Sequence, residues 1–100
     1  MLFVFHLLDR PGAAELRQRV RPQHKAYLAE MAERIAFAGP LTADDGVTMI
    51  GSLLAIEFNG RAAAERWLAD EPFTRAGVYQ HVSVLPFCNL WPQKTGFPPN

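Results

Sequence analysis

The chain of 100 residues carries ten basic and ten acidic side chains, and 49% of it is apolar or aromatic. Its length and composition predict one compact domain whose site lies on the core elements themselves. The balanced charge provides no basic face for nucleic acid and no polybasic patch for a membrane surface. The single Cys88 cannot form an internal disulfide, which favours a cytoplasmic location.

Residues 1–8 predict a strand that is apolar on both faces, too short to span a bilayer and without a basic leader. Residues 13–37 have a helical composition, which Pro22 divides into two predicted helical pieces. The second piece places His24 on the same stripe as Leu28, Met31 and Ile35.

A predicted hairpin follows, with its turn at Asp44-Asp45-Gly46. Residues 47–58 alternate as in a half-buried strand, and one face consists of Ile50, Ser52, Leu54, Ile56 and Phe58. A short helix over residues 61–70 is expected to stop at Pro72. Residues 78–85 alternate again, with Val82 and Val84 on one face and Tyr79 on the other.

The order of these elements predicts the ferredoxin-like βαββαβ arrangement of an α+β domain over residues 1–88. Residues 89–100 are expected to form an irregular C-terminal tail, because they are rich in proline. Two helices cover only one face of a four-stranded sheet, so a second copy of the chain is expected to cover the other. This predicts a homodimer, built as a dimeric α+β barrel.

His24 is the most informative residue, because an ionisable imidazole on a stripe that faces the sheet needs a partner. One interpretation is a core histidine bonded to a backbone carbonyl, and the other is a general acid or base that needs a carboxylate. Asp70 and Glu71 are the candidate carboxylates, since negative charge at a helix C-terminus is unfavourable without a compensating partner.

Other candidates carry weaker signals. Ser52 either bonds to the backbone or donates to a ligand, and Arg21 is either solvated or faces an anionic group. His6 and His81 lack metal-ligand spacing, and Cys88 has no positioned base, so neither a metal site nor a cysteine nucleophile is expected. No Gly-rich phosphate loop is present, and no cofactor is expected.

Several short motifs keep a common order along the chain: Arg21-Pro22-Gln23-His24, Ala38-Gly39-Pro40-Leu41, Gly51-Ser52, Glu71-Pro72-Phe73, Ala76-Gly77-Val78 and Val82-Ser83-Val84-Leu85-Pro86-Phe87. In order and spacing they resemble the YciI-like (YCII-related domain) family over nearly the whole chain, with no counterpart from Cys88 onward. The resemblance implies a ferredoxin-like dimeric α+β barrel. It also implies a pocket lined by a histidine and an acidic residue, proposed as an acid/base pair.

In this sequence the matching positions are His24 and Glu71. The family more often has Asp-Pro, so Glu71-Pro72 is a departure whose extra methylene changes the reach toward His24, and Asp70 stays open as the alternative. Most members of that family have no assigned reaction, but relatives include an enzyme that removes chloride from chlorinated hydroxyquinols, and related barrels include muconolactone isomerases.

The leading hypothesis is a cofactor-free lyase, dehydrochlorinase or isomerase that acts on a small, aromatic or lactone-like metabolite. His24 would move the proton, Glu71 would orient the imidazole, and Ser52 with the backbone at Gly39 would position a substrate oxygen. Arg21 and Asp70 complete the candidate substrate-binding residues. The alternative is a non-catalytic module that binds a small molecule or serves as an accessory dimer.

Overall fold

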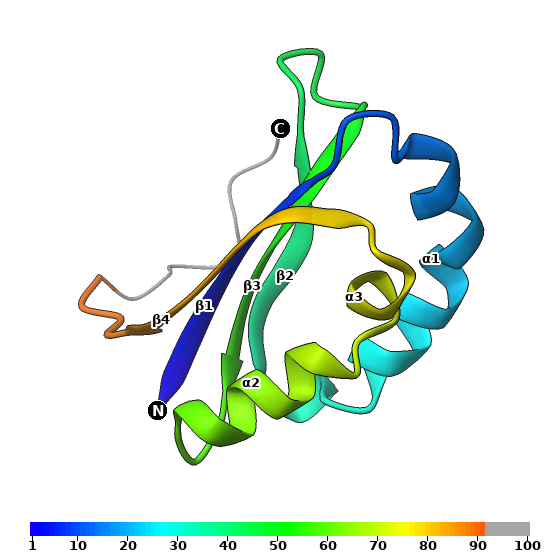
Figure 1. The fold of residues 1–100 in the computed structure, drawn as a ribbon. Helices are drawn as coiled ribbons and strands as arrows, with labels where there is room; N and C mark the ends of the chain where they lie inside the picture. The colour runs from blue at the N-terminus through cyan, green and yellow to red at the C-terminus, as the bar shows by residue number, and fades with distance from the viewer. Residues whose placement is uncertain (92–100) are drawn as a thin grey trace.

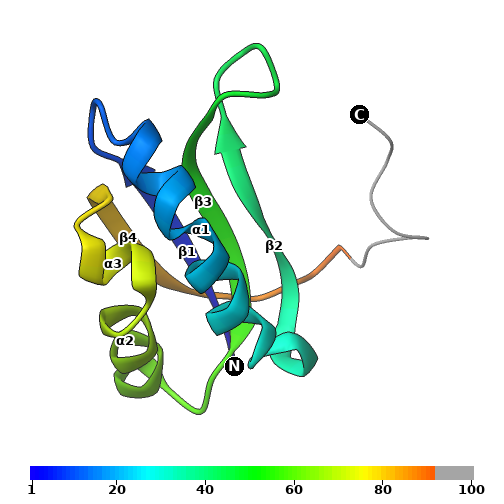
Figure 2. The ribbon, with the colours of Figure 1, turned by 90° about the vertical axis from the view of Figure 1, so that its right-hand side faces the viewer.

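The computed structural model describes residues 1–91, which form one antiparallel sheet with helices on one face. Figures 1 and 2 show all three helices on the same side of the sheet. The strands lie in the order β2-β3-β1-β4. The elements are β1 (Leu2–Asp9), α1 (Ala14–Ala29), a 3₁₀ turn (Ala32–Arg34), β2 (Ile35–Thr42), β3 (Met49–Glu57), α2 (Arg61–Ala69), α3 (Pro72–Ala76) and β4 (Tyr79–Phe87). The predicted ferredoxin-like α+β fold is confirmed.

The core lies between the sheet and the helices. Phe3, Phe5 and Leu7 point from β1 toward the helices, because alternate side chains of a strand share a face. Leu54 and Ile56 of the neighbouring β3 continue this layer. Ile50 is the exception to the predicted buried face of that strand, since 42% of it is exposed near the hairpin.

The helix after β1 is a single helix, so the prediction of two pieces divided at Pro22 is wrong. Proline has no N–H to donate to the carbonyl of Gln18, one turn earlier. Both residues are exposed, so water can satisfy that carbonyl and the helix continues. The prediction that the helical stripe continues to Met31 and Ile35 is also wrong, because α1 ends at Ala29 and Ile35 begins β2.

Pro72 begins a helix instead of only stopping one. It occupies the first turn of α3, where the missing N–H of proline would have no partner in any case. Gly77 ends α3 in the left-handed conformation with a φ of 77°. This short helix, which was not predicted from the sequence, sets the position of Glu71 at its N-terminus.

Strand β4 contains an irregularity that changes which face one residue occupies. Leu8 pairs with His81, but the next residue, Asp9, pairs with Tyr79, so Gln80 is skipped. A bulge of this kind shifts the alternation by one residue. Tyr79 therefore lies on the helix face with Val84, and the prediction that it lies on the opposite face is wrong.

The face of the sheet away from the helices is largely apolar. It includes Leu2 and Val4 of β1, which pair with the exposed Phe87 and Leu85 of β4. Among the described residues, no helix is long and apolar enough to cross a membrane. Most of the predicted irregular tail, residues 92–100, lies outside the described residues.

Candidate active site

His24 projects from α1 toward the sheet and is buried, as its stripe predicts. Its Nδ1 is hydrogen bonded to Oε1 of Glu71, whose side chain is fully buried. A buried carboxylate without a partner is costly, whereas a carboxylate paired with a histidine ring is satisfied. The extra methylene of Glu71 therefore does not prevent contact with His24.

The backbone of α3 holds the Glu71 carboxylate in place. Glu71 is the N-cap residue of α3, and its Oε1 accepts a hydrogen bond from the N–H of Phe73 at 3.2 Å. The positive end of a helix dipole favours a negative charge at this position, although a helix this short contributes little. The local electrostatics thus differ from the unfavourable helix C-terminus expected from the sequence.

Phe73 also fixes the imidazole from one side. The two rings of Phe73 and His24 stack with centroids 4.0 Å apart and planes 14° apart. The same phenyl ring also makes a T-shaped contact with Tyr79. Stacking and the Nδ1 hydrogen bond together leave the histidine ring little freedom to rotate.

Asp70 is not brought into this arrangement. It is the C-cap residue of α2, its side chain is exposed, and no contact joins it to His24 or to the cavity described below. Of the two acids that the sequence left open, Glu71 is therefore the one that contacts His24, and Asp70 does not line the cavity.

Arg17 lies two helical turns before His24 on α1 and anchors this helix to the sheet. Its Nε donates to Asp9 at 2.7 Å, and its Nη2 donates both to the carbonyl of Gly51 at 2.7 Å and to Ser52 Oγ at 2.6 Å. The guanidinium also lies over the ring of Phe73, 4.5 Å from its centroid. Arg17 is thus held on several sides and fixes Ser52.

Tyr79 connects this network to the histidine pair. Its hydroxyl lies 3.3 Å from Glu71 Oε2 and 3.5 Å from Ser52 Oγ. Burial raises the pKa of the Tyr79 phenol well above its usual value, and the nearby charge of Glu71 raises it further. Tyr79 therefore stays a neutral donor over the whole neutral range.

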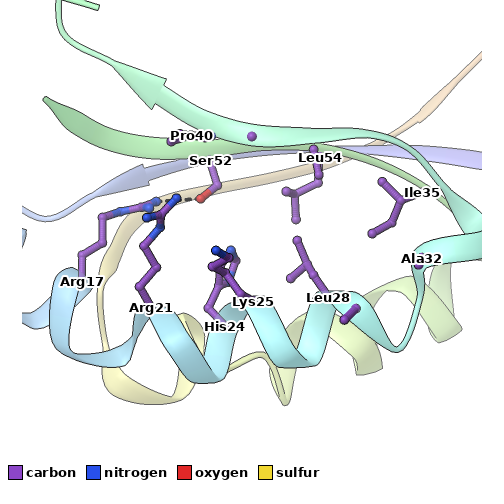
Figure 3. Close-up of a pocket in the computed structure, with 13 residues that line it drawn as sticks. Arg17, Arg21, His24, Lys25, Leu28, Ala32, Ile35, Pro40, Ser52 and Leu54 are labelled. Carbon is purple, nitrogen blue, oxygen red and sulfur yellow. Dashed lines mark hydrogen bonds between the residues drawn. The ribbon is translucent and has the colours of Figure 1, made fainter. Parts of the chain in front are cut away.

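A cavity of about 360 Å³ opens between α1 and the strands β2 and β3 (Figure 3). One end is polar and the other apolar. The polar side chains that line it are Arg17, Arg21, His24, Lys25 and Ser52. The apolar part is formed by Leu28, Ala32, Ile35 and Leu54, whereas Pro40 lies beside Ser52 and the backbone of Gly39 adds to the wall.

Nε2 of His24 is the ring nitrogen that remains available to a ligand in this cavity. Since Nδ1 is bonded to Glu71, only Nε2 remains for another partner, and no described residue is hydrogen bonded to it. A general acid or base needs one nitrogen fixed by a partner and the other free for substrate. The arrangement therefore suits proton transfer at Nε2.

The structure brings together His24, Glu71 and Ser52, and places Arg21 and Gly39 at the same cavity. Four further residues at the site were not predicted from the sequence: Arg17, Lys25, Phe73 and Tyr79. Arg17 lies two helical turns before His24, so the stripe could have revealed it. The cavity lining contains no carboxylate, and no group of metal-binding side chains occurs within residues 1–91.

The fold and this site define a class of protein: a ferredoxin-like α+β domain with a histidine–carboxylate pair beside a small cavity. The model of the YCII-related domain family matches residues 1–88, and the chain belongs to that family. Protein YciI of Escherichia coli O6:H1 is 38% identical over 94 residues, which cover 87% of this chain and 96% of that protein.

Two further similarities extend this finding. An uncharacterized protein of Haemophilus influenzae is 36% identical, with 87% of this chain and 96% of that protein covered. A solved structure, the 5-chloro-2-hydroxyhydroquinone dehydrochlorinase of Burkholderia phenoliruptrix AC1100 in complex with 2,5-dihydroxybenzoquinone, superposes with a TM-score of 0.82. It is 30% identical, and the match covers 88% of this chain and 94% of that chain.

Proposed function

We propose that the chain is a cofactor-free acid/base enzyme that moves a proton on a small metabolite, with His24 as the proton-transfer group. Glu71 holds the Nδ1 side of the imidazole and stabilises its positive charge when Nε2 accepts a proton. The observation that carries the proposal is the buried pair of His24 and Glu71, whose unpaired Nε2 is next to a cavity of about 360 Å³.

Two groups in the cavity wall would position a substrate oxygen. Ser52 Oγ accepts a hydrogen bond from Arg17, and its own hydroxyl hydrogen can turn toward the Tyr79 hydroxyl, 3.5 Å away, or toward a substrate oxygen. Gly39 contributes backbone to the wall on the β2 side. A hydroxyl or carbonyl oxygen of the substrate placed between them would lie on the sheet side of the cavity, facing the helix α1 that carries His24.

The similar dehydrochlorinase supports elimination of hydrogen chloride as the reaction to test first. Chloride does not leave readily from an aromatic carbon, so a hydroxyl proton must first move to the ring carbon that bears chlorine. In the resulting ketone tautomer, a second hydroxyl loses its proton as the carbon–chlorine bond breaks. The sum is loss of one proton and one chloride ion, with no oxidant, and one base that accepts and returns protons serves both steps.

The test is chloride release from 5-chloro-2-hydroxyhydroquinone by the wild type and by His24→Gln. We expect the wild type to release chloride, and the variant to be slower by about 100-fold or more, because glutamine cannot exchange a proton near neutral pH. His81→Gln is the matched control: His81 is exposed on the other face of the sheet and should leave the rate unchanged. Circular dichroism establishes that each variant folds.

The alternative is a module that binds its ligand without catalysis. In that case the wild type binds 2,5-dihydroxybenzoquinone, His24→Gln binds it equally well, and no chloride appears on long incubation. Equal chloride release by the wild type and His24→Gln would also contradict the proposed role of His24.

A further inference from the structure

Three cationic side chains of α1 line the cavity at a spacing of four residues: Arg17, Arg21 and Lys25. Side chains at this spacing lie next to one another on a helix, so like charges repel and destabilise the helix. The charge of Arg17 is offset by Asp9, at 2.7 Å. Arg21 is half-buried and Lys25 is exposed, and neither forms an ion pair or hydrogen bond with any residue of 1–91, so no protein group offsets their charge.

No acidic group is available in the cavity to neutralise them. The lining contains no aspartate or glutamate, and both buried carboxylates near it have other partners. Asp9 is paired with Arg17, and Glu71 is bonded to His24, the N–H of Phe73 and Tyr79. A cavity lined by charges of one sign attracts a ligand of the opposite sign. The unbalanced charge thus indicates an anionic ligand.

The other end of the cavity has the opposite character. Leu28, Ile35 and Leu54 face one another there, away from the arginines, as Figure 3 shows. The volume of about 360 Å³ lies at the low end of the range for small-molecule sites, which suits a ligand of about one ring. The cavity is therefore amphipathic along its length.

We propose that the substrate is a small amphipathic anion whose acidic oxygen group, a carboxylate or a phenolate, is bound by Arg21 and Lys25. Its apolar body, about one ring in size, packs against Leu28 and Leu54. Arg21 precedes His24 by three residues on α1, so the anionic group lies within one helical turn of the imidazole. The anion site itself is argued from the cavity alone. The inference rests on the proposed function in one respect: it takes the bound anion to be the substrate of His24.

Binding of two ring compounds that differ in charge tests the inference: benzoate and benzyl alcohol, measured by ligand-observed NMR. We expect the wild type to bind benzoate about 10-fold more tightly than benzyl alcohol, as for one charged hydrogen bond. Arg21→Gln and Lys25→Gln should each weaken benzoate binding by about that factor and leave benzyl alcohol unchanged. Added salt should weaken benzoate binding only.

Arg19→Gln is the matched control, since Arg19 is exposed on the same helix and does not line the cavity. A parallel titration with 2,5-dihydroxybenzoquinone distinguishes the two acidic groups: tighter binding than benzoate assigns a phenolate-type anion, and weaker binding a carboxylate. The inference is overturned if wild type binds benzoate no more tightly than benzyl alcohol, or if Arg19→Gln weakens benzoate binding as much as Arg21→Gln.

The outcomes separate this inference from the proposed function. Charge-dependent benzoate binding together with chloride release that survives His24→Gln supports the anion site and contradicts the acid/base role. Loss of chloride release in His24→Gln together with unchanged benzoate binding in Arg21→Gln and Lys25→Gln supports the acid/base role and contradicts the anion site.

Discussion

Among single residues, Glu71 determines the orientation of His24. Its carboxylate accepts from the N–H of Phe73, lies within reach of the Tyr79 hydroxyl, and is bonded to His24 Nδ1. Each of these contacts comes from a different part of the chain. The imidazole is therefore oriented by the folded structure, with Nε2 left for the cavity.

Tyr79 makes the stability of the fold depend on pH in the alkaline range. Because its pKa is raised, first by burial and then by Glu71, the folded protein holds the phenol proton more tightly than the unfolded chain does. This stabilisation is fully present below the unfolded value of about 10 and is lost as pH rises above it. In urea unfolding at pH 8 and pH 11, we expect a smaller loss of stability for Tyr79→Phe than for the wild type.

Tyr27 is the other tyrosine of the chain, and its pKa is raised as well, by burial and by the charges of Asp70, Glu71 and Glu30. It is less buried than Tyr79, so Tyr27→Phe serves as the control and should leave most of the alkaline loss in place. An equal alkaline loss in the wild type and in Tyr79→Phe would contradict this reading of the site.

Part of the site could be predicted from the sequence. The helical stripe pointed to His24, and the family resemblance favoured Glu71 as its partner while leaving Asp70 open; in the structure Glu71 makes the contact. Tyr79 could not be found, because the bulge at Gln80 reverses its face and no sequence pattern marks that bulge. The role of Phe73 depends on α3, whose start was interpreted only as a stop signal at Pro72.

At the scale of elements, the close approach of β1 and β3 positions Ser52 and the Gly51 carbonyl that binds Arg17. A Cβ atom at Gly51 would lie 2.3 Å from the carbonyl oxygen of Leu7, so only glycine fits there. We expect Gly51→Ala to destabilise the protein by about 1–3 kcal/mol, since the two strands must move apart. Chemical unfolding measures this.

Gly39→Ala is the matched control in the neighbouring strand, because an added Cβ meets nothing within 4 Å there. Its stability should change little. Equal stability of Gly51→Ala and wild type would show that the strands adjust freely and that the Arg17 anchor is not fixed by this contact.

The elements themselves were largely predictable, since strand alternation and the order of helices and strands gave the correct topology. The continuity of α1 through Pro22 was not predictable. It depends on the exposure of Gln18 and Pro22, which leaves the unpaired carbonyl in water, and exposure is a property of the packed structure.

At the scale of the whole molecule, we propose that a second copy of the chain covers the sheet face away from the helices. Leu85 and Phe87 are 60% and 42% exposed on this face, beside Leu2 and Val4. Burying such a surface is favourable, and a twofold dimer is the simplest closed assembly. We expect a dimer in sedimentation experiments and a monomer for Leu85→Glu.

Val47→Glu is the control for this prediction, because Val47 is 76% exposed in the loop between β2 and β3 and not on that face. It should remain a dimer. A monomeric wild type, or dissociation caused equally by both substitutions, would contradict the proposed interface.

NMR spectroscopy of the His24 ring in ¹⁵N-labelled protein, with and without benzoate, tests the pairing of His24 with Glu71. We expect a slowly exchanging proton on Nδ1 that is lost in Glu71→Gln and kept in Asp70→Asn, because only Glu71 contacts this nitrogen. Benzoate should shift the Nε2 resonance and leave Nδ1 unchanged. An Nδ1 signal that is indifferent to Glu71→Gln, or a ligand response at Nδ1 alone, would contradict the assignment of His24 as the group that faces the substrate.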